Sequence, residues 1–152
     1  MIYYSYIHEK ERAMEYYGQI EHQIDAKNRI RIPAAYRKQL GETYMFMAGS
    51  KGSIFVYPKA VLDEKLSAYA NTTHSDLQKL EALRKLTSTI FPACEDGQGR
   101  VVLPPVLRKH AGIKQDLITS CAAGRIELWA KERYLAEVSA VSVDDALAIL
   151  DF

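Results

Sequence analysis

Ile24-Asp25-Ala26-Lys27-Asn28-Arg29-Ile30-Arg31-Ile32-Pro33 is the first of two related copies of one motif, and this repetition is the main indication of the fold. The second copy, Asp96-Gly97-Gln98-Gly99-Arg100-Val101-Val102-Leu103-Pro104, restores the acid, the arginine, the apolar positions and the proline at an offset of 71 residues. Internal repetition of this kind indicates that the chain is built from similar structural units. The 152 residues, 48% of them apolar, therefore predict two small modules that share one core.

Each copy continues in the same way. A basic pair and a glycine follow the proline, as Arg37-Lys38 with Gly41 and as Arg108-Lys109 with Gly112. The pattern predicts a module of strand, turn, strand, short helix, strand, turn and strand. In the first copy we expect a hairpin of residues 17–24 and 29–32, a helix over 34–40, and strands over 43–48 and 54–57. In the second copy the last two strands are expected over 116–122 and 125–129.

The turn inside each copy carries two signals. The residue before the arginine must tolerate a left-handed backbone, and Asn28 and Gly99 are the residue types best suited to that conformation. The spacing also lets Asp25 bond to Arg29, and Asp96 to Arg100, across the turn. We expect these two ion pairs to brace the turns.

The remaining segments predict helices and a domain plan. Helices are expected over 58–70, 131–140 and 144–150, the last with Ser142 as N-cap, and a further one opens at a Ser75-x-x-Gln78 capping box. Its leucine row fits core packing or a subunit contact. The plan is an N-terminal extension (1–13), a first module with its trailing helix (14–74), a connecting helix (75–90) and a second module with C-terminal helices (91–152).

Charge is unevenly distributed along the chain. The net charge is only +1, yet residues 25–40 hold five cations against one acid and residues 96–114 hold four against one. Arginine on a strand can contact DNA phosphates or grip guanine in the major groove. A solvated charged face explains the same composition, so the two interpretations stay open at this point.

Other functional classes find little support. No GxSxG, HExxH or P-loop motif occurs, and His8, His22, His74 and His110 are scattered. Cys94 and Cys121 lack the spacing of a metal site or a disulfide framework. We expect no enzyme, no metal, no cofactor and no membrane span, and reduced cysteines suit a cytoplasmic protein.

The two turn motifs, their prolines, the 71-residue repeat, His22-Gln23-Ile24-Asp25 and Tyr57-Pro58 together resemble the MraZ proteins, bacterial transcription regulators built from tandem AbrB-like modules. The likeness covers residues 14 to 135. It implies an α+β fold with a mostly β core, namely a swapped-hairpin β-barrel with short and flanking helices. It also implies ring-shaped homo-oligomers.

The resemblance further implies a nucleoid-associated repressor that binds repeated operator elements in double-stranded DNA, upstream of the cell-division and cell-wall operon and of its own gene. Carried onto this sequence, the DNA-binding residues are Lys27, Arg29, Arg31, Arg37, Lys38, Arg100, Arg108 and Lys109. Gln98 replaces the lysine of the first motif, so the first copy is expected to dominate the phosphate contacts. The second copy is expected to contribute more to the barrel.

A rival interpretation is an AbrB-like protein-interaction module, such as an antitoxin that folds onto a toxin. Such a protein is expected to carry an extended acidic or disordered C-terminal tail that wraps its partner. Residues 138–152 are short and half apolar, which disfavours this alternative.

Overall fold

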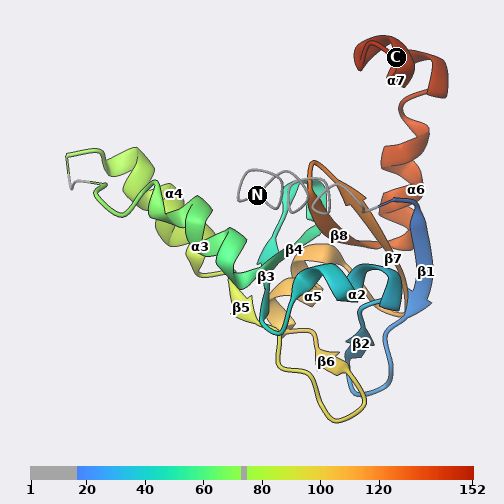
Figure 1. Cartoon of the computed structure of the whole chain (residues 1–152), viewed down its shortest axis with the longest axis horizontal. Helices are drawn as coiled ribbons and strands as arrows, with labels where there is room; N and C mark the ends of the chain where they lie inside the picture. Colours follow the sequence, from blue (N-terminus) through green and yellow to red (C-terminus); the bar gives the residue numbers. More distant parts are fainter. Residues whose placement is uncertain (1–16, 73–74) are drawn as a thin grey trace, which may run out of the picture.

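The computed structural model describes residues 17–72 and 75–152, so the expected extension over residues 1–13 lies outside the described part. The fold is α+β with a mostly antiparallel β core, which confirms the predicted class (Figure 1). The strands are β1 (Gln19–Gln23), β2 (Arg29–Arg31), β3 (Tyr44–Ala48), β4 (Ile54–Pro58), β5 (Phe91–Pro92), β6 (Arg100–Val102), β7 (Asp116–Ala122) and β8 (Arg125–Ala130). The helices are α2 (Ala34–Leu40), α3 (Lys59–Ser67), α4 (Leu77–Thr87), α5 (Pro105–Ala111), α6 (Lys131–Ser139) and α7 (Val143–Ile149), with a 3₁₀ turn at Ser50–Gly52.

The two copies interleave strand by strand. The larger sheet has six strands in the order β1-β7-β8-β4-β3-β5, and a two-stranded ribbon pairs β2 with β6. Strand β1 of the first copy pairs with β7 of the second, while β5 of the second pairs with β3 of the first. Strand β2 also pairs with β6, centred on Ile30↔Val101, and β4 pairs with β8, centred on Phe55↔Glu127. A pseudo-two-fold axis therefore relates the copies.

The predicted hairpin of residues 17–24 and 29–32 is wrong as a pairing. Both segments are strands, but β1 pairs with β7 and β2 pairs with β6. Only the turn between them is closed, by bonds from the Asp25 amide to the Arg29 carbonyl (3.0 Å) and from the Asn28 amide to the Asp25 carbonyl (3.0 Å). Alternation in a sequence shows which side chains share a face and does not identify the partner strand.

One hydrophobic core serves both copies. Its fully buried members come from corresponding positions of the repeat, including Ile30, Val101, Leu40, Ala111 and Phe46. The expectation of a closed barrel does not match the strand pairings of the described residues, because the larger sheet ends at β1 and β5 and the β2–β6 ribbon stands apart. The swapped arrangement is present without a closed ring of strands.

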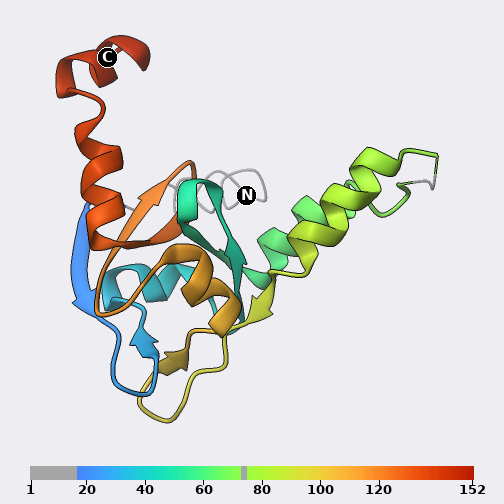
Figure 2. The same cartoon turned by 180° about the vertical axis from the view of Figure 1, so that it is seen from behind.

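Two helical extensions leave this core in different directions. Helices α3 and α4 form an arm on one side, and α6 carries α7 away from the sheet at the end opposite the β2–β6 ribbon (Figures 1 and 2). The predicted capping box at Ser75 is wrong: the N-cap is Asp76, whose carboxylate accepts a hydrogen bond from the Lys79 amide (3.2 Å). Ser142 is the N-cap of α7, as predicted.

Candidate nucleic-acid interface

The outward face of the β2–β6 ribbon carries the arginines of both motifs. Arg31 lies directly opposite Arg100, and Arg29 lies opposite Val102. Residues opposite each other in an antiparallel pair project from the same face. Ile30 and Val101, between them, are buried on the other face. The swap thus places arginines from two distant segments side by side.

An aspartate braces each turn that leads into the ribbon. Asp25 accepts hydrogen bonds from the Lys27 amide (2.9 Å), the Arg29 amide (2.8 Å) and the Arg29 Nε (2.7 Å). Asp96 accepts the same three bonds from Gln98 and Arg100, at 2.9, 2.9 and 2.8 Å.

Backbone geometry completes these turns. Asn28 and Gly99, with φ of 60° and 76°, adopt the left-handed conformation that the sequence predicted. At each turn the aspartate is bonded to the Nε of the arginine that follows it, Arg29 or Arg100, which fixes the position of that side chain.

These braces leave two cations uncompensated. Arg29 lies 2.7 Å from Asp25 and 3.8 Å from Asp96, and Arg100 lies 2.8 Å from Asp96. Lys27 and Arg31 are exposed, and neither forms an ion pair with any residue of 17–72 or 75–152. The four cations of the ribbon and its turns face two aspartates, which leaves a local charge of +2.

The arginines on the short helices α2 and α5, in contrast, are engaged in contacts within the chain. Arg37 donates to Glu95 and to the Gly41 carbonyl, and its guanidinium lies 5.1 Å from the Tyr44 ring centroid. Arg108 donates to the Leu103 carbonyl at 3.0 Å. Both side chains are therefore held by the fold. Lys38 and Lys109 are exposed on α2 and α5.

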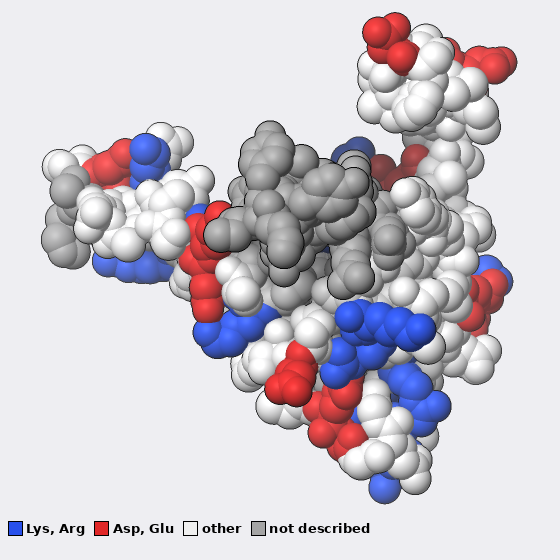
Figure 3. Space-filling view, viewed as in Figure 1, with Lys and Arg blue, Asp and Glu red and all other residues white. Residues whose placement is uncertain are grey.

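On the visible face, lysine and arginine side chains gather over α2 and the end of the molecule formed by the ribbon, with acidic side chains between them (Figure 3). The sequence pattern does not indicate Glu95 as the acceptor for Arg37, because residue 95 corresponds to the apolar Ile24 in the first copy. Nor does the pattern indicate that Val102 is exposed (56%) at the position equivalent to Arg31. The repeat alignment itself could have shown both differences.

Turn stability is expected to depend on pH. Hydrogen bonds from the Arg100 amide, the Gln98 amide and the Arg100 side chain lower the pKa of Asp96 from 3.8 to about 2. The hydrogen bond from the Arg29 amide likewise lowers the pKa of Asp25. A carboxyl whose pKa is lower in the folded state stabilises the fold above its unfolded pKa and loses that contribution as the pH falls toward its folded pKa. We expect the urea concentration at the unfolding midpoint to decrease as the pH is lowered from about 4 to about 2.

The Asp96→Asn variant isolates this effect. It should be less stable than the parent at pH 7 and should lose less stability over the same acidic range, as followed by circular dichroism in urea. Glu81→Gln, which removes an exposed carboxylate from the middle of α4, is the matched control. Parallel pH profiles for the parent and Asp96→Asn would contradict the role given to this carboxylate.

Other kinds of site are not supported within the described ranges. No group of three or more His, Cys, Asp or Glu side chains among residues 17–72 and 75–152 is placed to hold a metal ion. In the same part of the chain, no helix is long and apolar enough to cross a membrane. Within these ranges, the ribbon remains the candidate functional site.

A family model described as "MraZ protein, putative antitoxin-like" matches residues 16–81 and 94–148. The chain is also similar to curated proteins called transcriptional regulator MraZ. The one from Heliobacterium modesticaldum is 37% identical over 121 residues, covering 77% of this chain and 82% of the relative. The one from Clostridium acetobutylicum is 35% identical over 130 residues (84% and 89%), and the one from Thermoanaerobacter sp. is 40% identical over 119 residues (76% and 80%).

Proposed function

The chain belongs to the MraZ family of transcriptional regulators, and from this premise we propose that it recognises double-stranded DNA through the β2–β6 ribbon. It is a regulator of transcription and not an enzyme. The proposed partners are repeated operator elements upstream of the cell-division and cell-wall operon, including the promoter of its own gene. The proposed outcome is repression by a ring-shaped homo-oligomer associated with the nucleoid in the cytoplasm.

The observation that carries this proposal is the pairing of Arg31 with Arg100 on the ribbon. Like charges directly opposite each other across two strands are destabilising. Asp96 compensates Arg100, whereas no described acidic side chain pairs with Arg31. An external anion can relieve this repulsion, and a two-stranded ribbon fits the major groove of B-DNA. The proposed contacts are Lys27 with phosphate and Arg31 with phosphate or guanine.

The cations on α2 and α5 are proposed to contribute less to DNA binding than those of the ribbon. Lys38 is free to reach a phosphate, whereas Arg37 and Arg108 donate to Glu95 and to the Leu103 carbonyl. Arg29 and Arg100 lie close to aspartates and are proposed to contact DNA while bracing their turns. Among the proposed contacts, Lys27, Arg31 and Lys38 of the first copy are exposed, against Lys109 of the second. This difference supports the proposal that the first copy makes most of the phosphate contacts.

A single ribbon with a local charge of +2 offers few phosphate contacts, so affinity must come from several subunits on several repeats. Such multivalency raises affinity by about 10² to 10⁴ without new contacts. We expect fluorescence anisotropy to show much tighter binding to a duplex with several upstream repeats than to a duplex with one. We also expect affinity to fall steeply as salt increases. Equal binding to the native and a scrambled duplex would overturn the proposal of sequence-specific recognition.

The antitoxin alternative predicts a different partner. It requires a C-terminal segment that wraps a toxin, whereas residues 131–139 and 143–149 form two helices. An affinity pull-down that recovers one stoichiometric protein partner, without enrichment of upstream DNA, would favour the antitoxin. Enrichment of the operon DNA without such a partner would support the regulator.

A further inference from the structure

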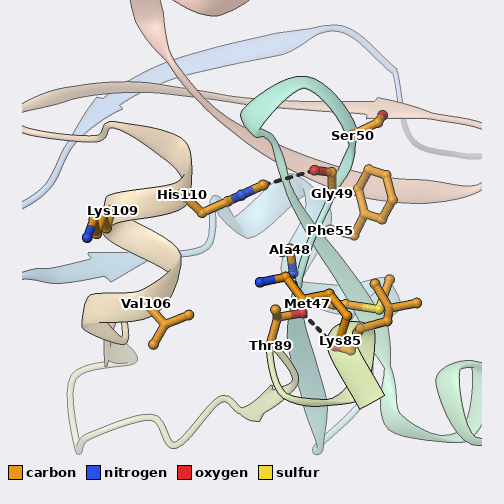
Figure 4. Close-up of a pocket in the computed structure, with 11 residues that line it drawn as sticks. Met47, Ala48, Gly49, Ser50, Phe55, Lys85, Thr89, Val106, Lys109 and His110 are labelled. Carbon is orange, nitrogen blue, oxygen red and sulfur yellow. Dashed lines mark hydrogen bonds between the residues drawn. The ribbon is translucent and has the colours of Figure 1, made fainter. Parts of the chain in front are cut away.

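A hollow of about 730 Å³ lies between the arm and α5, on the side of the β3–β4 hairpin. Pockets that hold sizeable ligands have volumes of roughly 300–1,000 Å³. We call it the α4–α5 groove. The lining side chains that give it its character are Met47, Phe55, Lys85, Leu86, Val106 and Lys109. Val106 and His110 project from α5 toward the hairpin (Figure 4).

Three hydrogen bonds fix the two walls of the groove. Thr89 accepts a hydrogen bond from the Ala48 amide (3.2 Å) and donates to the Leu86 carbonyl (2.7 Å), which ties the end of α4 to β3. On the other side, the His110 ring bonds to the Gly49 carbonyl at 2.9 Å. The groove is therefore held open by the fold.

The lining combines apolar side chains with positive charge. Met47, Phe55, Leu86 and Val106 supply apolar surface, and Lys85 and Lys109 supply cations. Within the described part of the chain, no Asp or Glu lines the groove. Its occupant should therefore present apolar side chains next to carboxylates.

Helix α7 complements this lining, because it carries exposed apolar side chains and acidic residues. Val143, Leu147 and Leu150 share one face, because residues three and four apart lie side by side on a helix, and they are 75%, 45% and 67% exposed. Asp144 lies beside this face. Residues 134–152 contain four acids and no lysine or arginine. This segment therefore pairs an exposed apolar surface with negative charge.

We propose that α7 of a second copy of this chain docks into the α4–α5 groove. In its own chain, α7 stands at the far end of α6, away from α4 (Figures 1 and 2). The contact joins two different surfaces, so it is head-to-tail and closes into a ring when the rotation permits. The inference rests on the homo-oligomer of the proposed function and assigns Lys109 to an interface between copies.

Two complementary variants test this docking. The groove variant carries Lys85→Glu and Val106→Asp, and the tail variant carries Leu147→Ser and Leu150→Ser; all four side chains are exposed. Light scattering after size exclusion should show an oligomer for the parent and a monomer for each variant. A mixture of the two variants retains one intact groove and one intact α7, and it should form a heterodimer and nothing larger.

Arg84→Glu is the matched control, because it reverses a neighbouring charge on α4 that does not line the groove, and it should keep the parent mass. Parental mass in both double variants, a mixture that stays monomeric, or a monomeric parent would each overturn the docking proposal. DNA binding of the parent is measured separately on the duplex with several repeats and on a scrambled duplex of the same length. If the parent binds both duplexes equally while the masses behave as expected, the proposed DNA recognition fails and the docking stands.

Discussion

Replacing Arg31 with alanine is expected to weaken binding to the repeated operator by about 10²-fold or more. A bidentate arginine–guanine contact contributes about 1–3 kcal/mol, and the loss is repeated in every subunit that engages the DNA. Arg31 is the clearest test because it is exposed and has no acidic partner among the described residues. Its removal also eliminates the repulsion from Arg100, so the fold should be no less stable.

The measurement is fluorescence anisotropy with the multi-repeat duplex, together with the thermal midpoint of each variant. Arg84→Ala, which removes an exposed cation from the arm, is the matched control and should bind as the parent does. Arg29→Ala is a less selective probe, because Arg29 braces Asp25 and also lies 3.8 Å from Asp96. Unchanged affinity of Arg31→Ala for the operator would show that the ribbon is not the recognition surface.

Local features of the fold were predictable from the sequence because their causes are local. Asn28 and Gly99 occupy left-handed positions for which few residue types are suitable. Asp25 and Arg29 are close enough along the chain to pair in any fold that keeps the turn. The short helices after Pro33 and Pro104 depend on the same local rules, and both formed.

Strand partners were not predictable in the same way. The expected hairpin failed because β1 and β2 pair with strands about 70 to 100 residues away. The alternation of Arg29, Ile30 and Arg31 correctly separated the buried face from the exposed one. It could not show that Arg100 would lie opposite Arg31.

The candidate site was predicted in part. Lys27 and Arg31 are exposed, as a binding role requires. Arg37 instead pairs with Glu95, a long-range contact that no motif indicated. Lys109 lines the α4–α5 groove, which only the packing of α4 beside α5 creates. The role of each of these residues in DNA binding stays a prediction.

The largest effect on stability is expected from Ile30→Ala. Ile30 is 1% exposed and lies opposite Val101 at the pseudo-two-fold axis, where the two copies meet. Truncating a buried isoleucine to alanine typically costs about 2–5 kcal/mol. Because the core contains side chains from both copies, the variant should destabilise both together. Urea unfolding followed by tryptophan fluorescence, which reports on Trp129 of the second copy, and by circular dichroism should give one shared, lowered midpoint.

Val102→Ala is the matched control, because Val102 belongs to the same ribbon but is 56% exposed. A surface substitution of this kind should change stability by no more than about 0.5 kcal/mol. If Ile30→Ala lowered the circular dichroism midpoint and left the Trp129 transition unchanged, the second copy would be stable without the first. That result would contradict a shared core, because β1, β2 and β4 of the first copy all pair with strands of the second.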